Sequence, residues 1–336
     1  IIAMSEYKGI KGFQVQTRAE DPSEPIVGDF YYNSSTGQFK TVNSGTGSWA
    51  SGGNFPGPYY LNGGSGGTTT AGWTAAGALS GSYINESYEY DGTSWGSAVN
   101  MNRNTGGYLG GCGPQIAGIA VSGYSNAPPA GDVTDCETYN GSSWTSIAGL
   151  PAARKENTTG GTATAALAAG GAHPGGTGNQ EYFVWNGSSW TDSGNINTAR
   201  SNANAGNGIS TSMLVISGTD PTTTVTESWN GSSWTEIAEV NTGRYRAQAA
   251  GVNNSDTLFY SGSLTPGTAQ AKTEQWNGST WTEVGDLAQA RKWPGGNGTS
   301  SAAWAMGGDT GPGSSEIATT EIWNLPDFET KTVTTT

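Results

Sequence analysis

Residues 229–234 read WNGSSW, and residues 185–190 read the same six letters. Near copies stand at YDGTSW (90–95), YNGSSW (139–144) and WNGSTW (276–281). Five occurrences favour a part of the architecture over a catalytic motif, which a chain needs only once. Asn-Gly and Asp-Gly are strong hairpin signals because both residues tolerate a positive φ. We therefore predict that each copy is a β-hairpin whose aromatic residues pack across the two strands or onto the next repeat. The Asn-Gly-Ser triplets also match the acceptor motif for N-glycosylation, but the predicted hairpins already explain why they recur.

The copies recur with a regular period. The second aromatic of each copy is a tryptophan, and successive ones are 44 to 49 residues apart: Trp95, Trp144, Trp190, Trp234 and Trp281. Trp49 extends this series backward, and Trp323 extends the series of first aromatics forward. Such a period is typical of propeller blades and is longer than most helical repeats. We expect Trp144, Trp190, Trp234 and Trp281 to be largely buried, at equivalent places in each unit.

Each period contains signals for four short strands. The unit 234–281 opens with the alternating WTEI, continues through GRYRAQAAG and the apolar run TLFYSG, and returns to KTEQWNGSTW. An apolar run of small residues that ends in glycine suits a strand buried on both faces; it recurs at 71–77, 116–123, 163–171, 212–218, 257–262 and 301–308. No stretch shows the period of an amphipathic helix. The sequence therefore predicts an all-β fold, a six-bladed β-propeller of four-stranded blades over residues 49–336, with seven blades if residues 1–48 form one of their own.

A closed ring needs its first and last blades joined, because an open sheet edge invites pairing with other chains. WNLPDF, after the last apolar run, aligns with WNGSTW, so the final strand could come from 328–333. The competing segment is 48–53. We expect 48–53 to pair beside 321–324, because Trp49 keeps the aromatic of the repeat whereas Phe328 follows a proline.

The repeats resemble a known family. An apolar strand ending in Gly or Gly-Gly, then Glu, an aromatic, Asn or Asp, and later Trp, resembles the Kelch-type repeat, and residues 89–95 and 274–281 show this pattern. The resemblance covers roughly residues 49–336. It implies a β-propeller and says little about function, because one fold carries many activities.

Residues 1–48 differ from the repeats. GFQVQT (12–17) indicates a strand, DFYYN and GQFKTV indicate a hairpin, and EDPSEP (20–25) indicates a linker. The opening MSEYKGIKGFQVQTRAEDPSEP, with GDFYYNSSTGQFKTV and GSWASGGN, looks like tail-associated structural proteins of bacteriophages, marine phages in particular. This resemblance implies a virion protein, present in several copies, that contacts other virion proteins through residues 1–48 and offers its loops to a host-surface glycan or protein.

Composition excludes several partners. The chain has 336 residues, of which 54 are glycine and only 12% are charged, and its net charge is −13. A nucleic-acid partner is not expected, because phosphate contacts need a basic surface. Membrane insertion is not expected either, because no apolar run reaches about 18 residues. Met4 reads as a natural start without a secretory signal. The expected location is the virion, with an extracellular location as the alternative.

Charged residues follow the same period. Arg154, Arg200, Arg244 and Arg291 each lie ten residues after a tryptophan, Arg103 lies eight after Trp95, and Tyr59 occupies the tenth position after Trp49. One glutamate accompanies each unit: Glu89, Glu137, Glu181, Glu227, Glu274 and Glu321. Recurrence in every unit is what packing of repeats demands, so we predict charge-assisted bonds within or between blades. The alternative is a ring of arginines at the channel mouth that binds an acidic ligand.

No catalytic residue, cofactor or metal site is expected, and the binding residues are left open. A copper site like that of galactose oxidase, an enzyme with Kelch-like repeats, needs two histidines, and this chain has only His173. We expect His173 in a solvated loop, without an identifiable partner for a Ser-His-Asp arrangement. Calcium could use the non-repeated acids, although no Asp-x-Asp-x-Asp run supports such a site; these acids are Asp132, Asp135, Asp220, Asp256 and Asp309.

The two cysteines, Cys112 and Cys136, fall on the first and third strands of one predicted blade. Two strand spacings separate them by roughly 9–10 Å, beyond the reach of a disulfide. We therefore expect free thiols.

The predicted function is non-enzymatic, a structural or receptor-facing protein of a phage tail. Loops rich in Trp, Tyr, Asn, Ser and Gly suit adaptable contacts with glycans or proteins. The alternative is a secreted or surface propeller that binds or hydrolyses glycans, and hydrolysis would need a close pair of non-repeated carboxylates in a pocket.

Overall fold

The computed structural model describes residues 15–24, 26, 28–60, 63–79, 82–103, 106–175, 178–202, 207–219, 222–311, 315–326 and 328–333. Within these residues every regular element is a β-strand, which confirms the all-β prediction. None of them forms a helix long and apolar enough to cross a membrane. The chain divides into two compact units, which we call the terminal unit (Ile1–Gly47 with Leu325–Thr336) and the ring unit (Ser48–Asn324).

The terminal unit contains one four-stranded sheet in the order β1 (Gln16–Arg18), β2 (Phe30–Asn33), β3 (Gln38–Ser44) and β33 (Phe328–Thr332). β2 and β3 form the hairpin expected for DFYYN and GQFKTV. Residues 325–336 thus group with the N-terminal segment, and the division of the chain differs at its C-terminus from 1–48 and 49–336.

Asp21 lies in the segment expected to be a linker, but its carboxylate binds side chains of the terminal sheet. It accepts hydrogen bonds from the Tyr31 hydroxyl at 2.7 Å and the Asn33 amide at 2.9 Å, and it pairs with Lys40 at 2.9 Å. These contacts hold the segment against the buried face of the sheet, where Tyr31 and Val42 are almost inaccessible to solvent.

The described part of the ring unit contains six four-stranded antiparallel sheets, numbered here 1 to 6 in chain order. The first three are sheet 1 with β6 (Gly64–Gly67), β7 (Gly72–Ala75), β10 (Ser87–Tyr90) and β11 (Trp95–Ser97), sheet 2 with β12 (Gly110–Cys112), β13 (Gly118–Ser125), β14 (Gly131–Tyr139) and β15 (Trp144–Ile147), and sheet 3 with β16 (Thr158–Thr162), β17 (Ala165–Ala169), β18 (Asn179–Trp185) and β19 (Trp190–Arg200).

The remaining three sheets repeat this order. They are sheet 4 with β20 (Gly208–Ile209), β21 (Ser212–Ile216), β22 (Thr226–Trp229) and β23 (Trp234–Ile237), sheet 5 with β24 (Gln248–Asn253), β25 (Asp256–Tyr260), β28 (Thr273–Trp276) and β29 (Trp281–Glu283), and sheet 6 with β30 (Gly295–Gly298), β31 (Ala302–Met306), β32 (Thr320–Asn324) and β4 (Ser48–Ser51).

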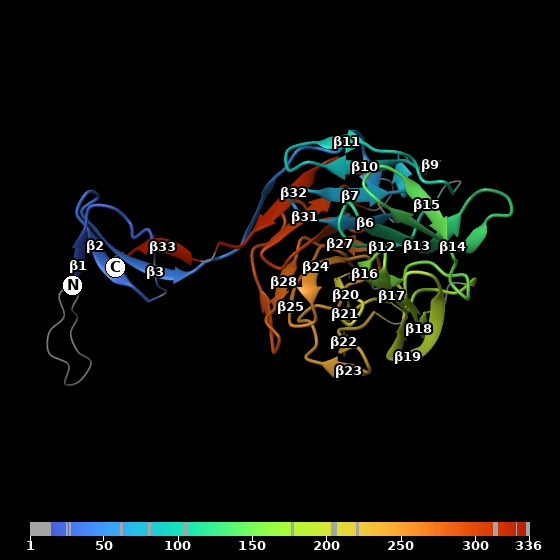
Figure 1. Cartoon of the computed structure of the whole chain (residues 1–336). Helices are drawn as coiled ribbons and strands as arrows, with labels where there is room; N and C mark the ends of the chain where they lie inside the picture. The colour runs from blue at the N-terminus through green and yellow to red at the C-terminus, as the bar shows by residue number, and fades with distance from the viewer. Residues whose placement is uncertain are drawn as a thin grey trace. The chain divides into compact units, whose positions relative to one another are not determined.

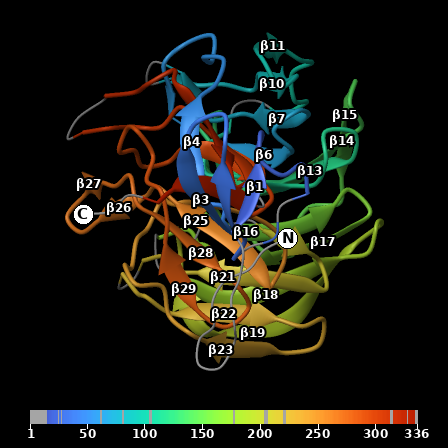
Figure 2. The same cartoon turned by 90° about the vertical axis from the view of Figure 1, so that its left-hand side faces the viewer.

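Two small sheets involve the loops between second and third strands, and one of them also includes a strand that precedes sheet 1. One contains β5 (Tyr59–Tyr60), β8 (Ala78–Leu79) and β9 (Ser82–Tyr83). The other is the hairpin of β26 (Ser263–Leu264) and β27 (Thr268–Ala269), labelled at the left of Figure 2.

The first strands of the six sheets contact one another in a closed circle, in the order β6, β12, β16, β20, β24, β30 and back to β6. Figure 1 labels β6, β12, β16, β20 and β24 near the middle of the ring unit. Glycine permits this approach: a Cβ at Gly111 would lie 2.4 Å from the backbone nitrogen of Ser65. The second strands are buried beside them, and all six apolar runs expected at this place are strands β7, β13, β17, β21, β25 and β31.

The core lies between neighbouring sheets. One cluster, for example, joins Leu214 and Ile216 of sheet 4 to Ala249, Phe259 and Trp276 of sheet 5. Sheets that pack face to face around a circle in this way bury both of their faces.

The circle closes with an N-terminal strand. β4 pairs with β32, and Trp49 lies opposite Trp323 with the ring centroids 5.6 Å apart. The expected pairing of 48–53 beside 321–324 is therefore observed, and the competing segment, as β33, pairs with β3 instead.

Each WNGSSW copy is a hairpin, as predicted, but for a different reason. Trp229 lies opposite Trp234, and four residues connect them. Only Gly231 has a positive φ, at 92°. The side chain of Asn230 instead accepts hydrogen bonds from the backbone N–H groups of Ser232 and Ser233, both at 2.9 Å. The asparagine is thus required because its side chain forms an Asx turn. The two-residue turn expected from the Asn-Gly sequence, in which both residues have a positive φ, is not formed.

Candidate functional site

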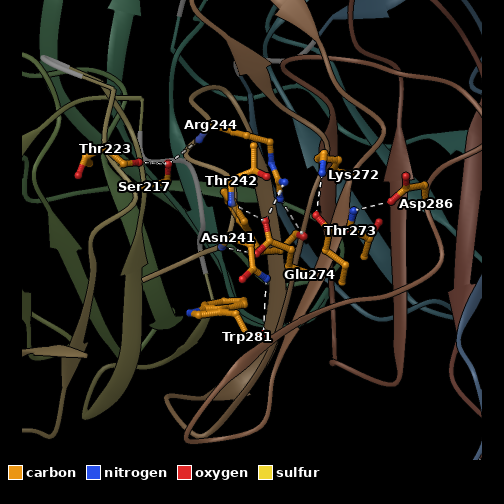
Figure 3. Close-up of polar contacts among 12 residues, drawn as sticks. Ser217, Thr223, Asn241, Thr242, Arg244, Lys272, Thr273, Glu274, Trp281 and Asp286 are labelled. Atoms are coloured by element: carbon orange, nitrogen blue, oxygen red, sulfur yellow. Dashed lines mark hydrogen bonds and ion pairs between the residues drawn. The ribbon is translucent and has the colours of Figure 1, made fainter. Parts of the chain in front are cut away.

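The repeated arginines and glutamates form buried ion pairs, one in each of sheets 2 to 6: Arg103–Glu137, Arg154–Glu181, Arg200–Glu227, Arg244–Glu274 and Arg291–Glu321. Figure 3 shows the pair of sheet 5, where Arg244 Nη1 lies 3.0 Å from Glu274 Oε1. The same carboxylate accepts the backbone N–H groups of Asn241 at 2.7 Å and Thr242 at 3.3 Å. We call the five arginines of these ion pairs the clamp arginines.

Four of the clamp arginines, Arg154, Arg200, Arg244 and Arg291, also join two sheets through their backbone carbonyls. The carbonyl of Arg244 accepts the N–H of Gly218 in sheet 4 at 3.2 Å, while its guanidinium donates to the carbonyl of Phe259 in sheet 5 at 3.3 Å. Burial lowers the pKa of Arg244 to about 10. The clamp guanidinium groups are sealed from solvent in these pairs, so they do not form a ring that is open to an acidic ligand.

Two sheets depart from this pattern. In sheet 3, Glu181 lies four residues before Trp185 instead of two, and its side chain is 37% exposed although it still meets Arg154 at 2.7 Å. His173 lies beside it in the loop between β17 and β18, with Nε2 3.8 Å from Glu181 Oε2. In sheet 1, Glu89 accepts the hydroxyl of Tyr139 at 2.8 Å.

Four of the repeated tryptophans are buried: Trp95, Trp144, Trp190 and Trp281. The expectation for Trp234 was wrong, because its side chain is only partly buried. It packs on Tyr182 and Trp229, and its indole nitrogen has no hydrogen-bond acceptor among the described residues. The Trp281 indole, by contrast, donates to the carbonyl of Ala238 at 3.0 Å.

A second position recurs shortly before the first strand of sheets 2 to 6, and in sheets 3 to 6 it lies two residues after the clamp arginine. Its occupants differ in chemistry but share a left-handed backbone with φ between 51° and 60°: Tyr108, Glu156, Asn202, Arg246 and Trp293. We call them the mouth ring. The corresponding position before sheet 1, residue 61, lies outside the described residues.

Contacts between successive members close the mouth ring. Glu156 N donates to the Tyr108 carbonyl at 2.8 Å, and Asn202 Nδ2 donates to Glu156 Oε2 at 2.7 Å. Arg246 N donates to the Asn202 carbonyl at 3.1 Å, and Trp293 N donates to the Arg246 carbonyl at 2.9 Å. The rings of Trp293 and Tyr108 complete the circle with centroids 6.4 Å apart.

The variation of side chains on a constant backbone favours a functional role for the mouth ring. A left-handed residue other than glycine costs about 1–2 kcal/mol. The same conformation recurs near the ends of second strands at Ala76, Ser122, Ser217 and Ser261, but there the side chains are all small. A chain with 54 glycines places none at these five positions. Repeated residues of constant chemistry, such as the clamp arginines, serve the packing, whereas this position keeps its geometry and varies its side chain.

Further aromatic side chains gather beside the mouth ring. The ring of Tyr60 lies 5.9 Å from that of Trp293, and Tyr83 lies 6.2 Å from Tyr108 and 6.0 Å from Tyr124. Burial raises the pKa of Tyr83, so its hydroxyl stays neutral.

A cavity of about 320 Å³ opens among these tyrosines, with Lys155 and Glu156 in its wall. Lys155 Nζ lies 5.5 Å from the Tyr124 ring centroid and 3.3 Å from Asp132. Partly exposed rings next to charged groups can hold a ligand that has both apolar and polar faces.

The opposite ends of the first strands are chemically plainer. There the turns into the second strands surround a cavity of about 210 Å³ with one glycine from each sheet: Gly67, Gly113, Gly161, Gly208, Gly251 and Gly298. Threonine side chains and the exposed Val252 join this lining. The chemical variety of the channel is therefore concentrated at the mouth ring.

The remaining candidate groups lie apart from one another. Asp132 and Asp309 pair with Lys155 and Lys292, and Asp256 accepts the hydroxyl of Ser300. Asp135 is exposed, and Asp220 lies outside the described residues. Over the described ranges, no three His, Cys, Asp or Glu side chains are grouped to hold a metal ion.

The cysteines are buried free thiols in β12 and β14, the first and third strands of sheet 2. Burial raises the pKa of Cys112 to about 12 and that of Cys136 to about 11.

Sequence reasoning missed the mouth ring. Aligning the repeats on their arginines would have revealed a position of varying chemistry two residues after the arginine in sheets 3 to 6. Such an alignment would not have shown that these residues contact one another across the sheets.

Comparison with known proteins supports the assignment of the fold. No protein-family model matches the chain, and no curated protein matches it either. Among solved structures, one described as "Structure of YjhT" is similar with a TM-score of 0.70 at 13% sequence identity, over 84% of this chain and 99% of that chain. This likeness and the circle of four-stranded sheets show a β-propeller fold.

Proposed function

We propose that this chain is a non-enzymatic recognition protein whose ligand binds at the mouth ring of a six-bladed, Kelch-like propeller, with one blade for each of sheets 1 to 6. The observation that carries the proposal is the mouth ring itself. Five side chains of different chemistry are held in one strained backbone geometry at the end of the channel.

The chemistry of the mouth ring favours a glycan or a protein of a host surface as the ligand. Rings of Tyr108 and Trp293 stand beside the guanidinium of Arg246 and the carboxylate of Glu156. Aromatic side chains supply large contact areas at low cost in conformational entropy, and polar neighbours set the orientation. The loops that carry them are the usual location of binding residues on a rigid scaffold.

The resemblance of residues 1–48 to phage tail proteins supports a place on the virion for this recognition module. In this proposal the terminal unit binds a neighbouring virion protein, and several copies of the chain face the host. Cross-linking of purified particles, followed by mass spectrometry, tests the placement. Cross-links from Lys40 or Lys331 to another virion protein are expected, and absence of the chain from particles would contradict it.

Binding is tested with the purified chain on a glycan array and on extracts of host-surface protein. Trp293→Ala and Tyr108→Ala should reduce the signal roughly tenfold or more, as truncated aromatic anchors do. Phe39→Ala removes an exposed aromatic ring from the terminal unit and should leave binding unchanged. Loss of binding in the Phe39 variant alone would move the ligand site away from the mouth ring.

The alternative of a glycan-hydrolysing propeller is tested with the same glycans. Release of reducing ends that depends on Glu156, in the wall of the tyrosine cavity, or on Asp132, which pairs with Lys155 of that wall, would replace recognition by hydrolysis. Binding without turnover is the expected result.

A further inference from the structure

A second cavity lies beside the mouth ring, at Arg246. Its volume is about 350 Å³, and it is lined by Arg246 and Lys292 together with two loops that contribute Thr268 and Thr310. The first loop belongs to the hairpin β26–β27, and the second follows Asp309 of sheet 6. Two cations and two hydroxyl-bearing residues thus line one concave space.

Arg246 differs from every other arginine of the chain. Six of the seven arginines donate side-chain hydrogen bonds, Arg18 to Gln16 and the five clamp arginines to carbonyls or glutamates. Arg246 makes neither a hydrogen bond nor an ion pair through its side chain with any residue that the structure describes, and its Nε is buried without an acceptor.

The guanidinium of Arg246 is nevertheless held in place. It stacks on Trp293 at 3.7 Å from the ring centroid and lies 4.8 Å from the centroid of Tyr245. Stacking fixes the plane of the group and leaves its N–H edges available, which is the arrangement that binds a carboxylate with two parallel hydrogen bonds. Burial lowers the pKa of Arg246, although Tyr245 and Glu156 act against this change. Because burial destabilises the charged guanidinium, an anion bound there would stabilise it.

Lys292 supplies the second charge of the cavity. Its side chain is 9% exposed, and Nζ lies 3.5 Å from Asp309 and 3.1 Å from the carbonyl of Gly311. Asp309 therefore balances Lys292, and the guanidinium of Arg246 remains as the cation without a paired carboxylate among the described residues.

We propose that Arg246 binds the carboxylate of an acidic sugar, within a glycan whose neighbouring ring stacks on the aromatic residues of the mouth ring. This inference rests on the proposed function and narrows it to glycans that carry uronic or similar acids. Tyr60 and Tyr108 provide further rings beside Trp293, on which the guanidinium itself stacks. Acidic peptides are typically bound by clusters of arginines, whereas here one guanidinium lies among aromatic rings of the mouth ring, which favours a sugar.

The test compares oligogalacturonate with its methyl ester, which has the same sugar rings without the charge. Isothermal titration with the full chain should show the acid form binding roughly tenfold or more tightly than the ester, because hydrogen bonds to charged groups are the stronger ones. Arg246→Gln should abolish this difference in affinity between the acid form and the ester. Arg246→Lys should retain part of it, and Arg18→Gln in the terminal unit is the matched control.

The outcomes separate the two proposals. Equal affinity for acid and ester, with both lost in Trp293→Ala, would overturn the acidic-sugar inference and leave the proposed function in place. Absence of any ligand for the mouth ring on neutral and acidic arrays would overturn both. Binding of poly-glutamate that depends on Arg246, without binding of the uronate, would identify an acidic peptide instead. Thermal melts of the variants check folding, and salt should weaken only the binding of the acid form.

Discussion

The hydroxyl of Tyr59 donates a hydrogen bond to the backbone carbonyl of Ala76, in the place where the other sheets use a clamp arginine. In sheet 4, Arg200 donates to the equivalent carbonyl of Ser217 at 3.2 Å. Tyr88 stands in sheet 1 where sheets 2, 4, 5 and 6 have the glutamate, and its ring lies 6.4 Å from that of Tyr59. Sheet 1 therefore replaces the buried ion pair by two aromatic rings and keeps the hydrogen bond.

Substitutions at Tyr59 and Tyr88 test whether these two residues replace the arginine and glutamate of the other sheets. Tyr59→Phe should cost about 1–2 kcal/mol of the free energy of unfolding, because it leaves the buried carbonyl of Ala76 without its donor. Tyr59→Arg should cost more, because position 88 carries a tyrosine and not the glutamate that pairs with the buried arginine in sheets 2, 4, 5 and 6. Adding Tyr88→Glu should recover part of the loss in urea unfolding. A double variant no more stable than Tyr59→Arg would contradict the equivalence.

The clamp arginines should differ in importance. Arg244→Ala should cost about 3–5 kcal/mol of unfolding free energy, because it leaves the fully buried Glu274 unpaired. Arg154→Ala should cost less, because Glu181 is 37% exposed and water can solvate it. Denaturant unfolding of both variants measures the difference, and the reverse order would show that exposure does not decide the cost.

Removal of two equivalent tryptophans should have unequal effects. Trp281→Ala should cost about 3–5 kcal/mol, as other large core truncations do. Trp234→Ala should cost less, because that ring is only partly buried and its indole nitrogen lacks an acceptor within the described chain. Thermal melts give the comparison. Equal shifts in the melting temperature would mean that the outer edge of sheet 4 is better packed than its burial indicates.

The Asx turns predict which substitutions the hairpins accept. Asn230→Ala should cost about 1 kcal/mol, because it removes the acceptor of two backbone N–H groups. Asn230→Asp should be nearly neutral at pH 7, because Asp91 already fills this place in sheet 1. Backbone N–H groups of Ser94 and Thr93 lower the pKa of Asp91 to about 2.

The sign of the pH effect follows. The folded pKa of such an aspartate lies below the unfolded value, so its stabilisation is present above about pH 4 and is lost as the pH falls through about 2. NMR titration of the Asp91 carboxyl measures this directly. A pKa in the ordinary range would show that the turn does not depend on the carboxylate.

The two thiols should be silent in the folded protein. Burial raises the pKa of Cys112 to about 12 and that of Cys136 to about 11, above the unfolded value. The neutral thiols therefore favour the folded state below about pH 8.5, the unfolded pKa, and this advantage is lost as the pH rises through 11 to 12. A disulfide reagent at pH 8 should react with neither thiol until denaturant is added. Fast reaction of one thiol would place it at the surface.

The sequence by itself determined the repeating parts of this protein. The period, the hairpins and the glycine-ended second strands are local signals written once per unit, and so are the arginine and the glutamate that meet in each clamp. The choice of 48–53 to close the circle was also legible, because Trp49 carries the same aromatic as the other copies.

Only the tertiary structure decided which residues meet at the end of the channel. Tyr108 and Trp293 are far apart in the chain, and closure of the circle brings their rings within 6.4 Å. The exposure of Glu181 and Trp234 and the pairing of β33 with β3 likewise depend on neighbours from other segments. The repeat pattern shows only the residues that the units have in common. The mouth ring consists of residues that differ between the units, and their side chains come together only when the sheets pack in a circle.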